Sequence, residues 1–217
     1  MGKSMINPAL EAYINKKIIP MYDFFDDAHN RAHVMQVIKN SQQIAQHYEV
    51  DDNKVFTIAA YHDTGLTQGR KDHEKSSALF LLADTALTQW FTQAELLLMA
   101  EAVEDHRASK TEPPRSIYGK IVAEADRDIE YTRIFTRVIQ YSIAAYPHYT
   151  LEAHYQRCYT HMQEKYGVDG YLKLWLDSEP NRGELQKIRD SLANADIFNG
   201  EFMRLFALFI PPTPPTK

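Results

Sequence analysis

The segment DDNKVFTIAAYHDTG, residues 51–65, decides the fold class of this chain. Its middle, residues 55–60, is apolar almost all round, and such a pattern indicates a buried helix. The aspartates that precede it suit a helix N-cap, and Gly65 suits the residue that follows a helix end. The sequence therefore predicts a core helix that ends at the polar pair His62-Asp63.

Three further segments place apolar residues at helical spacing. They are HNRAHVMQVIKNSQQIAQHYEV (29–50), TQAELLLMAEAVEDH (92–106) and SIYGKIVAEADRDIEYTRIF (116–135). The second of them begins with a capping box, Thr92 with Glu95. More helices are expected at about 149–166, 168–177, 182–194 and 198–209. Strand signals are nearly absent, so the sequence predicts an all-α fold built as a compact multi-helix domain.

The composition is that of a globular protein that is large enough to bury a core. The 217 residues are 44% hydrophobic and 24% charged, with a formal charge of −5 and a pI near 6.0. This balance argues against a duplex nucleic acid as partner, because that role needs a concentrated basic face. No stretch approaches the length of a membrane span or a signal peptide, and one cysteine, Cys158, suits a reducing compartment. We expect a cytoplasmic protein.

The expected organisation is one domain with an extension at each end. Residues 1–24 should form an N-terminal helix that packs on the core, and residues 25–145 should form the core itself. Residues 146–210 should supply C-terminal helices that complete the same domain and offer a contact for a homodimer. Residues 211–217, rich in proline, should form a disordered tail.

Four residues on three expected helices bring polar, metal-competent groups toward the apolar interior. His33 lies beside Val34 in the first helix, His62 and Asp63 close the core helix, and Asp126 follows Val122 by one turn. A carboxylate near a core-facing position is costly unless it is paired or binds a cation. Two imidazoles and two carboxylates suit Mn, Fe, Co, Ni, Zn or Mg, with positions left for water and substrate oxygens.

The order H…HD…D on successive helices resembles the HD-domain phosphohydrolase superfamily, in particular its small bacterial members. The resemblance rests on HVMQVIKNSQQIA, TIAAYHDTGL and IVAEADRDIE and covers roughly residues 25–140. It implies an all-helical HD-domain fold and a divalent metal bound by His33, His62, Asp63 and Asp126. It also implies hydrolysis of a phosphate ester or anhydride, commonly on a nucleotide.

Two more histidines raise the question of a second metal ion. His73 and His106 lie between the HD pair and Asp126, where some HD proteins carry extra ligands of a dinuclear site. His73 follows the HD pair more closely than in such proteins, so a second-shell or substrate-binding role is the alternative for both. His29, one turn before His33, could also touch the site, or be an exposed residue in the helix's first turn.

Acid–base and phosphate-binding candidates surround these ligands. Asp63 is the first candidate to hold the attacking water, as a ligand or as a bridge between two ions, and Glu74 and Asp72 are candidate general bases or acids. Four cationic residues are candidates for binding a substrate phosphate, and Lys110 is a weaker one. These four are Arg70, Lys71, Arg107 and Arg127.

Two functions of other classes compete with the phosphohydrolase. A di-iron oxygenase of the HD fold would require His73 and His106 both to bind iron. A non-enzymatic module that contains a metal and senses a nucleotide would bind its ligand without turnover. The sequence leaves the substrate, the bond broken and the native metal open.

Overall fold

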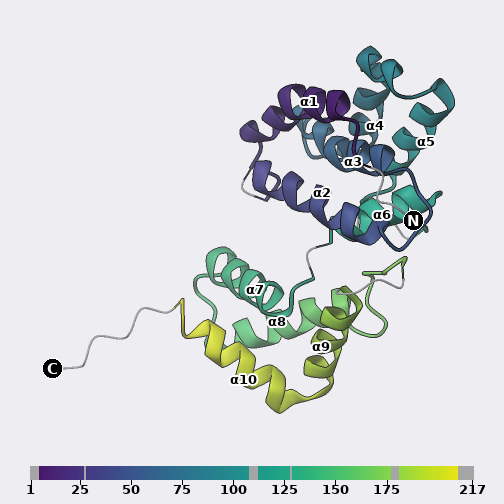
Figure 1. The fold of residues 1–217 in the computed structure, drawn as a ribbon. Helices are drawn as coiled ribbons and strands as arrows, with labels where there is room; N and C mark the ends of the chain where they lie inside the picture. The colour runs from purple at the N-terminus through teal and green to yellow at the C-terminus, as the bar shows by residue number, and fades with distance from the viewer. Residues whose placement is uncertain (1–4, 27, 108–111, 128, 177–180, 210–217) are drawn as a thin grey trace. The chain divides into compact units, whose positions relative to one another are not determined.

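The computed structural model describes residues 5–26, 28–107, 112–127, 129–176 and 181–209, and every regular element in these ranges is a helix (Figure 1). The predicted all-α class is therefore confirmed. The bounds are α1 Pro8–Lys17, η1 Ile19–Phe24, α2 Arg31–Ala45, α3 Asp52–Tyr61, η2 Thr64–Gln68, α4 His73–Ala83, η3 Thr85–Gln89, α5 Gln93–Glu104, α6 Ile117–Ala125, α7 Tyr131–Ala145, α8 Leu151–Tyr166, α9 Asn181–Ala193 and α10 Ala195–Phe206, where η marks a 3-10 helix. Within the described ranges, no helix combines the length and the apolar character that a bilayer crossing requires.

The chain divides into two compact units, Met1–Arg127 and Asp128–Lys217. We call them the N-terminal unit, with α1 to α6, and the C-terminal unit, with α7 to α10. This division differs from the expected limit at residue 145. The reason is that the buried face of α7, which includes Ile134 and Phe135, packs with α8 and α10. The expected tail 211–217 lies outside the described residues.

Helix α3 is the centre of the N-terminal unit. It begins at the N-cap Asp51, whose side chain accepts a hydrogen bond from the Asn53 amide, and all its residues from Val55 to Tyr61 are buried. Helices α2, α4, α5 and α6 all pack against it, and α1 adds its buried Leu10 and Ile14. The buried core helix predicted from residues 51–65 is confirmed, and its C-terminal end is where His62 and Asp63 lie.

The structure corrects three local predictions. The helix that carries Ile121 ends at Ala125, so Asp126 is its C-cap residue rather than a residue within it. No helix forms over 168–176, where the chain turns at Gly170 and folds back on the end of α8. Gly65 is not a left-handed residue after a helix but lies inside η2.

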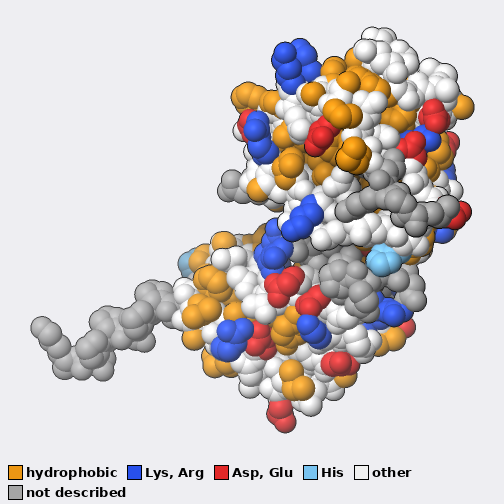
Figure 2. All heavy atoms as spheres, viewed as in Figure 1, with side chains coloured by type: hydrophobic (Ala, Val, Ile, Leu, Met, Phe, Trp, Pro, Cys, Tyr) orange, Lys and Arg blue, Asp and Glu red, His pale blue; other side chains and the backbone are white. Residues whose placement is uncertain are grey.

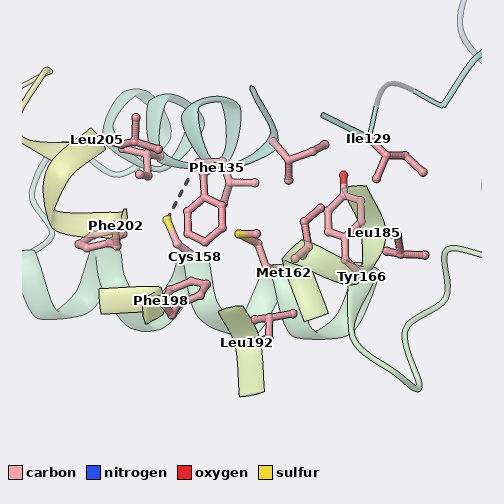
Figure 3. Packing of buried hydrophobic residues seen from close by; sticks show 14 of the residues in the cluster. Ile129, Phe135, Cys158, Met162, Tyr166, Leu185, Leu192, Phe198, Phe202 and Leu205 are labelled. Atoms are coloured by element: carbon pink, nitrogen blue, oxygen red, sulfur yellow. Dashed lines mark hydrogen bonds between the residues drawn. The ribbon is translucent and has the colours of Figure 1, made fainter. Parts of the chain in front are cut away.

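The C-terminal unit has a separate aromatic core (Figure 3). Phe135 of α7 packs on Phe198 of α10 with ring centroids 5.0 Å apart, and Phe202 stacks with Phe206. Cys158 of α8 is buried in this core, and its thiol donates to the carbonyl oxygen of Val138 at 3.8 Å. Cys158 is thus a small buried residue of this core and forms no disulfide. On the face drawn in Figure 2, basic and acidic side chains are interspersed over both units.

Candidate metal centre

Helices α2 and α3 bring the first group of donor atoms together. His33 lies in the first turn of α2, which is capped by Asn30, and His62 is the C-cap residue of α3. The Nε2 atoms of the two imidazoles lie 3.3 Å apart. Asp63 Oδ2 lies 3.2 Å from His62 Nε2 and 3.7 Å from His33 Nε2. These three residues, the first trio, place one donor atom each around a common point.

Asp126 adds a fourth donor on the same side. Its Oδ1 lies 3.2 Å from His33 Nε2 and 3.8 Å from His62 Nε2. The end of α6 is held against α2 by Asn40, whose amide donates to the Ala125 carbonyl at 3.2 Å. The structure thus brings together all four residues predicted as the principal ligand set.

A second trio shares Asp63 with the first. His73 is the first residue of α4, and His106 follows the end of α5. Asp63 Oδ1 lies 3.2 Å from His73 Nε2 and 3.4 Å from His106 Nε2, whereas its other oxygen faces the first trio. The two oxygens of Asp63 therefore face two different pairs of imidazoles. This is the arrangement that a carboxylate bridging two ions requires.

Three of the imidazoles are oriented by the backbone in the same way. Their Nδ1 atoms donate to carbonyl oxygens, His62 to Ala59 at 2.7 Å, His73 to Arg70 at 3.1 Å and His106 to Val103 at 2.6 Å. A neutral imidazole that donates from Nδ1 has a lone pair on Nε2. Three such lone pairs then converge on carboxylate oxygens, which also carry lone pairs.

This convergence is the test of whether the residues fit a metal ion. Buried lone pairs that face each other repel unless a proton or a cation lies between them. Imidazole nitrogens and carboxylate oxygens together are the ligand types of Mn, Fe, Co, Ni and Zn. The backbone carbonyls that accept from Nδ1 and fix the tautomers are the partners expected around metal-ligating histidines. The donor set therefore fits a divalent ion in each trio.

The histidines around the centre hold its carboxylates in the ionised form when they are protonated, a part that a metal ion would take over from the protons. Burial alone raises the pKa of Asp63, but the charge of His62 and hydrogen bonds from His106, His62 and His73 lower it well below its usual range. Burial also opposes the charged form of His106, yet the hydrogen bond to Asp63 raises its pKa. For Asp126, burial is likewise outweighed by His33, and the pKa is lowered. The carboxylates stay ionised and attract positive charge.

Two residues that the sequence did not assign to the site, Tyr22 and Gly65, support the HD pair. The hydroxyl of Tyr22 donates to the Ala60 carbonyl at 2.9 Å and accepts from the Asp63 amide at 3.2 Å. Its ring stacks on that of His62, with centroids 6.2 Å apart. At Gly65, an added Cβ would lie 2.2 Å from the His73 carbonyl oxygen, so only glycine allows α4 to approach η2 this closely.

The loop between η2 and α4 places Arg70 beside the centre. Gly69 and Asp72 both have positive φ, 105° and 54°, and the loop directs the Arg70 carbonyl toward His73. The Arg70 guanidinium donates to Asp26 at 2.7 Å and remains largely exposed. Lys71 is exposed in the same loop.

His29 lies at the same edge of the site. Its Nδ1 lies 2.7 Å from Asp26 Oδ1, and its ring contacts that of His33 with centroids 5.8 Å apart. Asp26 therefore connects His29 with Arg70, two residues that lie far apart in the sequence. The hydrogen bond from Arg70, followed by the one from His29, holds the pKa of Asp26 below its ordinary value.

The remaining candidates occupy different surroundings. Glu74 is buried beside His73 and accepts from Arg107 at 3.2 and 3.3 Å. Asp72 is paired with Lys75 at 3.2 Å, and its carboxylate is half-exposed. Arg127 is buried and lies 3.9 Å from Glu124. Its Nε and Nη1 have no hydrogen-bond partner among the described residues. Lys110 lies outside the described residues.

A second arginine pair supports the end of α5 and was not predicted. Arg115 donates from its amide and from Nε to Asp105 Oδ2 at 2.8 and 2.9 Å, and from Nη2 to Oδ1 at 2.9 Å. Asp105 is buried and immediately precedes His106. The sequence offers no spacing signal for this contact, because the two residues lie in different elements.

Comparison with known proteins places these residues in a family. Residues 31–129 match the family model described as HD domain, and this range contains every donor residue named above. A solved structure described as a predicted HD superfamily hydrolase from an uncultured Thermotogales bacterium is 26% identical, with a TM-score of 0.50. The similarity covers 70% of this chain and 83% of that one. No match was found among the curated proteins.

Proposed function

We propose that this chain is a metal-dependent phosphohydrolase that cleaves a phosphate ester or anhydride of a small compound, nucleotides being the first class to test. The proposal starts from residues 31–129, which match the HD-domain family model. The observation that carries the proposal is the pair of donor trios that share Asp63. A solved structure that resembles the chain is described as a predicted hydrolase, which supports the same reaction class. The single buried cysteine suits a reducing compartment, and a cytoplasmic location is part of the proposal.

In this proposal one ion is held by His33, His62, Asp63 and Asp126, and a second by Asp63, His73 and His106. A divalent ion in such a site lowers the pKa of bound water and neutralises charge on a phosphoryl group. Water attacks phosphorus, the bond from phosphorus to the leaving oxygen breaks, and the leaving group takes up a proton. The part of Asp63 is to orient the attacking water through its carboxylate.

The cationic residues have the complementary task of binding the phosphate. Arg70 suits this best, because its exposed guanidinium is held at the edge of the site by Asp26 and retains N–H groups for a second acceptor. Arg127 is a second candidate, since its buried Nε and Nη1 have no hydrogen-bond partner in the described part of the chain. Lys71 can add a point charge from the same loop as Arg70.

The test measures release of phosphate and pyrophosphate from a panel of nucleotides by chelator-stripped protein reloaded with Mn²⁺. We expect turnover that depends on the metal and that Asp63→Ala abolishes, with a loss of at least about a thousandfold. The matched control is Asp190→Ala, which removes an exposed carboxylate of α9 that accepts from Gln186 at 2.8 Å. Turnover that survives in Asp63→Ala would exclude this mechanism, and the product would identify the bond broken.

The second trio also supports one alternative, the di-iron oxygenase. That function needs His73 and His106 as ligands, and both face Asp63 Oδ1. Purification with two redox-active iron ions and consumption of dioxygen with a substrate would favour it. Full phosphohydrolase activity with redox-inert Mg²⁺ or Zn²⁺ would exclude it as the main function.

A further inference from the structure

The two trios differ in what holds their histidines. In the first trio, His33 lies in the first turn of α2 and His62 is the C-cap residue of α3, and these two helices pack against each other. In the second trio, His73 starts α4 and His106 follows the last residue of α5. Helix ends are held less firmly than helix interiors, because their backbone hydrogen bonds are incomplete. All four histidines lie at helix ends, but those of the second trio are flanked by Glu74, Asp105 and Arg107, charged residues that form arginine–carboxylate pairs.

Two arginine–carboxylate pairs support the second trio, and each involves a neighbour of one of its histidines. Glu74, directly after His73, accepts from Arg107 Nη1 with both of its oxygens, at 3.2 and 3.3 Å. Arg107 itself directly follows His106. The ion pair therefore closes a ring that runs from His73 through Glu74 and Arg107 to His106, and back through Asp63.

The second pair fixes the end of α5 from the other side. Asp105, directly before His106, is buried and receives three hydrogen bonds from Arg115 at 2.8 to 2.9 Å. Arg115 also donates to the Glu101 carbonyl at 3.1 Å and to Glu104 at 2.6 Å. Its guanidinium thus binds the last turn of α5 at several points, although the intervening chain leaves that helix.

We propose that these two pairs, Glu74–Arg107 and Asp105–Arg115, are positioning devices that set the affinity of the second trio for its divalent ion. The inference rests on the proposed function, which supplies the two-ion site, and it refines the roles expected of two residues. Glu74 then acts through His73 rather than on a proton of the reaction. Arg107 acts through Glu74 rather than on the substrate phosphate.

The geometry favours this assignment over the chemical roles. A buried carboxylate that accepts two charge-assisted hydrogen bonds from one guanidinium is held ionised and in place. Burial raises the pKa of Glu74, but its own backbone amide and Arg107 outweigh burial and lower it. Groups that orient metal-ligating histidines typically change metal affinity by about 10- to 100-fold when they are removed.

The test counts bound Mn²⁺ ions and measures their affinities in the absence of substrate, by native mass spectrometry and isothermal titration calorimetry. The wild-type chain should bind two ions, the second more weakly. Arg107→Ala and Arg115→Ala should each weaken the second ion by about 10- to 100-fold and change the first by less than about threefold. The matched control is Arg204→Ala, which removes a bidentate pair with Glu201 at 2.9 and 2.7 Å in the C-terminal unit.

A double-mutant cycle separates positioning from a general loss of charge. Glu74→Gln keeps the shape of the side chain and should reproduce the loss seen in Arg107→Ala. The double variant should be no weaker than the worse single variant, because both remove one interaction. The more conservative Arg107→Lys, which keeps the charge, should recover part of the affinity and serves if Arg107→Ala does not fold.

The outcomes distinguish the inference from the proposed function. The positioning role would be overturned if Arg107→Ala and Arg115→Ala bound the second ion as tightly as wild type does. It would also be overturned if the wild-type chain bound a single ion. A variant Arg107→Ala that changes KM but not the second-ion affinity would return Arg107 to the phosphate. If the variants weaken the second ion but not the first, and the wild-type chain has no phosphohydrolase activity, the positioning role is supported and the proposed function is not.

Discussion

The two units of this chain bury very different kinds of residues. The buried charged and imidazole side chains of the N-terminal unit are His62, Asp63, Glu74, Asp105, His106, Glu124 and Arg127. The buried polar residues described in the C-terminal unit are Ser142, His154 and Ser191. Buried charges cost free energy unless partners or ions compensate them, whereas buried aromatic rings stabilise by themselves. The N-terminal unit therefore gives up stability to build a site, and the C-terminal unit does not.

Removal of metal should separate the two units most clearly. Chelation should abolish activity and lower the free energy of unfolding of the N-terminal unit by about 4 kcal/mol, the value for an ion present at about a thousand times its Kd. The C-terminal unit should keep its stability. Labelling of Cys158 can report on that unit alone, because it is the one cysteine of the chain and is buried there.

Burial raises the pKa of the Cys158 thiol to about 11, so labelling at neutral pH requires opening of the C-terminal unit. The labelling rate should be the same with and without metal. A rate that rises on chelation would mean that the two units unfold together, and the comparison between them would fail. Circular dichroism during thermal unfolding would show two transitions if the units unfold separately and one transition if they unfold together.

A cavity in the aromatic core should produce the reverse result. Phe198→Ala removes a fully buried ring that contacts Phe135, Tyr155 and Tyr159 at centroid distances of 5.0 to 5.5 Å. The cost should be about 3 to 4 kcal/mol, measured by urea unfolding. Labelling of Cys158 should accelerate accordingly, while metal affinity stays unchanged.

The control for this change is the neighbouring residue Ile197, which is half-exposed on the same helix. Ile197→Ala should change the free energy of unfolding by less than about 0.5 kcal/mol. Metal affinity that falls in Phe198→Ala would show that the C-terminal core supports the site, contrary to the separation argued above.

The same difference explains how far the sequence could predict this protein. Helix α3 was predictable, and so was the cluster of His33, His62, Asp63 and Asp126, because polar residues at otherwise apolar helical positions are a local signal. The break after Ala125 was not, since apolar spacing continues to residue 129 across the division between the units. The helix expected over 168–177 failed because the turn at Gly170 bonds this segment to the end of α8.

The supporting residues of the site were the least predictable. Asp26 pairs with Arg70 across 44 positions, and Arg115 pairs with Asp105 across 10. Neither pair follows a helical or strand period, because the partners come from different elements. Sequence patterns report which residue types face a core, but such contacts depend on the packing of helices that the pattern leaves open.

Two glycines offer a sharper comparison, because the same substitution should act with opposite sign in the two units. A Cβ at Gly65 would lie 2.2 Å from the His73 carbonyl oxygen and 2.5 Å from the Ser77 amide, both backbone atoms. Gly65→Ala should therefore cost about 2 to 3 kcal/mol in the N-terminal unit and weaken metal binding. At Gly200, in α10, a Cβ would meet open space.

Gly200→Ala should stabilise the C-terminal unit by up to about 1 kcal/mol, because alanine has the higher helix propensity. Urea unfolding of both variants measures whether each substitution raises or lowers the free energy of unfolding, and Mn²⁺ titrations measure its effect on metal affinity. A destabilising Gly200→Ala would reveal that another surface approaches this face of α10. If Gly65→Ala left the free energy of unfolding unchanged, α4 could move away from η2 at no cost. The close packing behind His73 would then not contribute to stability.

The smallest expected effects lie at two helix N-caps, one in each unit. Thr92 caps α5 within a full capping box, in which Glu95 accepts from the Thr92 amide, whereas Thr150 caps α8 alone by accepting from the Ala153 amide at 3.2 Å. Thr92→Ala and Thr150→Ala should each cost about 1 kcal/mol near pH 7, measured by urea unfolding. The two should diverge in acid, because only the first cap includes a carboxylate.

The direction of that divergence follows from the pKa of Glu95, which the hydrogen bond from Lys54, and then those from Thr92, lower from 4.5 to about 2. A group whose pKa is lower in the folded state stabilises fully above its unfolded pKa, and this contribution is lost as the pH falls through the folded value. Because the unfolded state is the same in wild type and variant, the cost of Thr92→Ala should shrink only as the pH falls toward the folded value of about 2, while the cost of Thr150→Ala stays constant. Equal pH profiles would show that the box contributes nothing beyond the threonine hydroxyl. A shrinking Thr92 profile would show that the Glu95 carboxylate contributes to the stability of this cap.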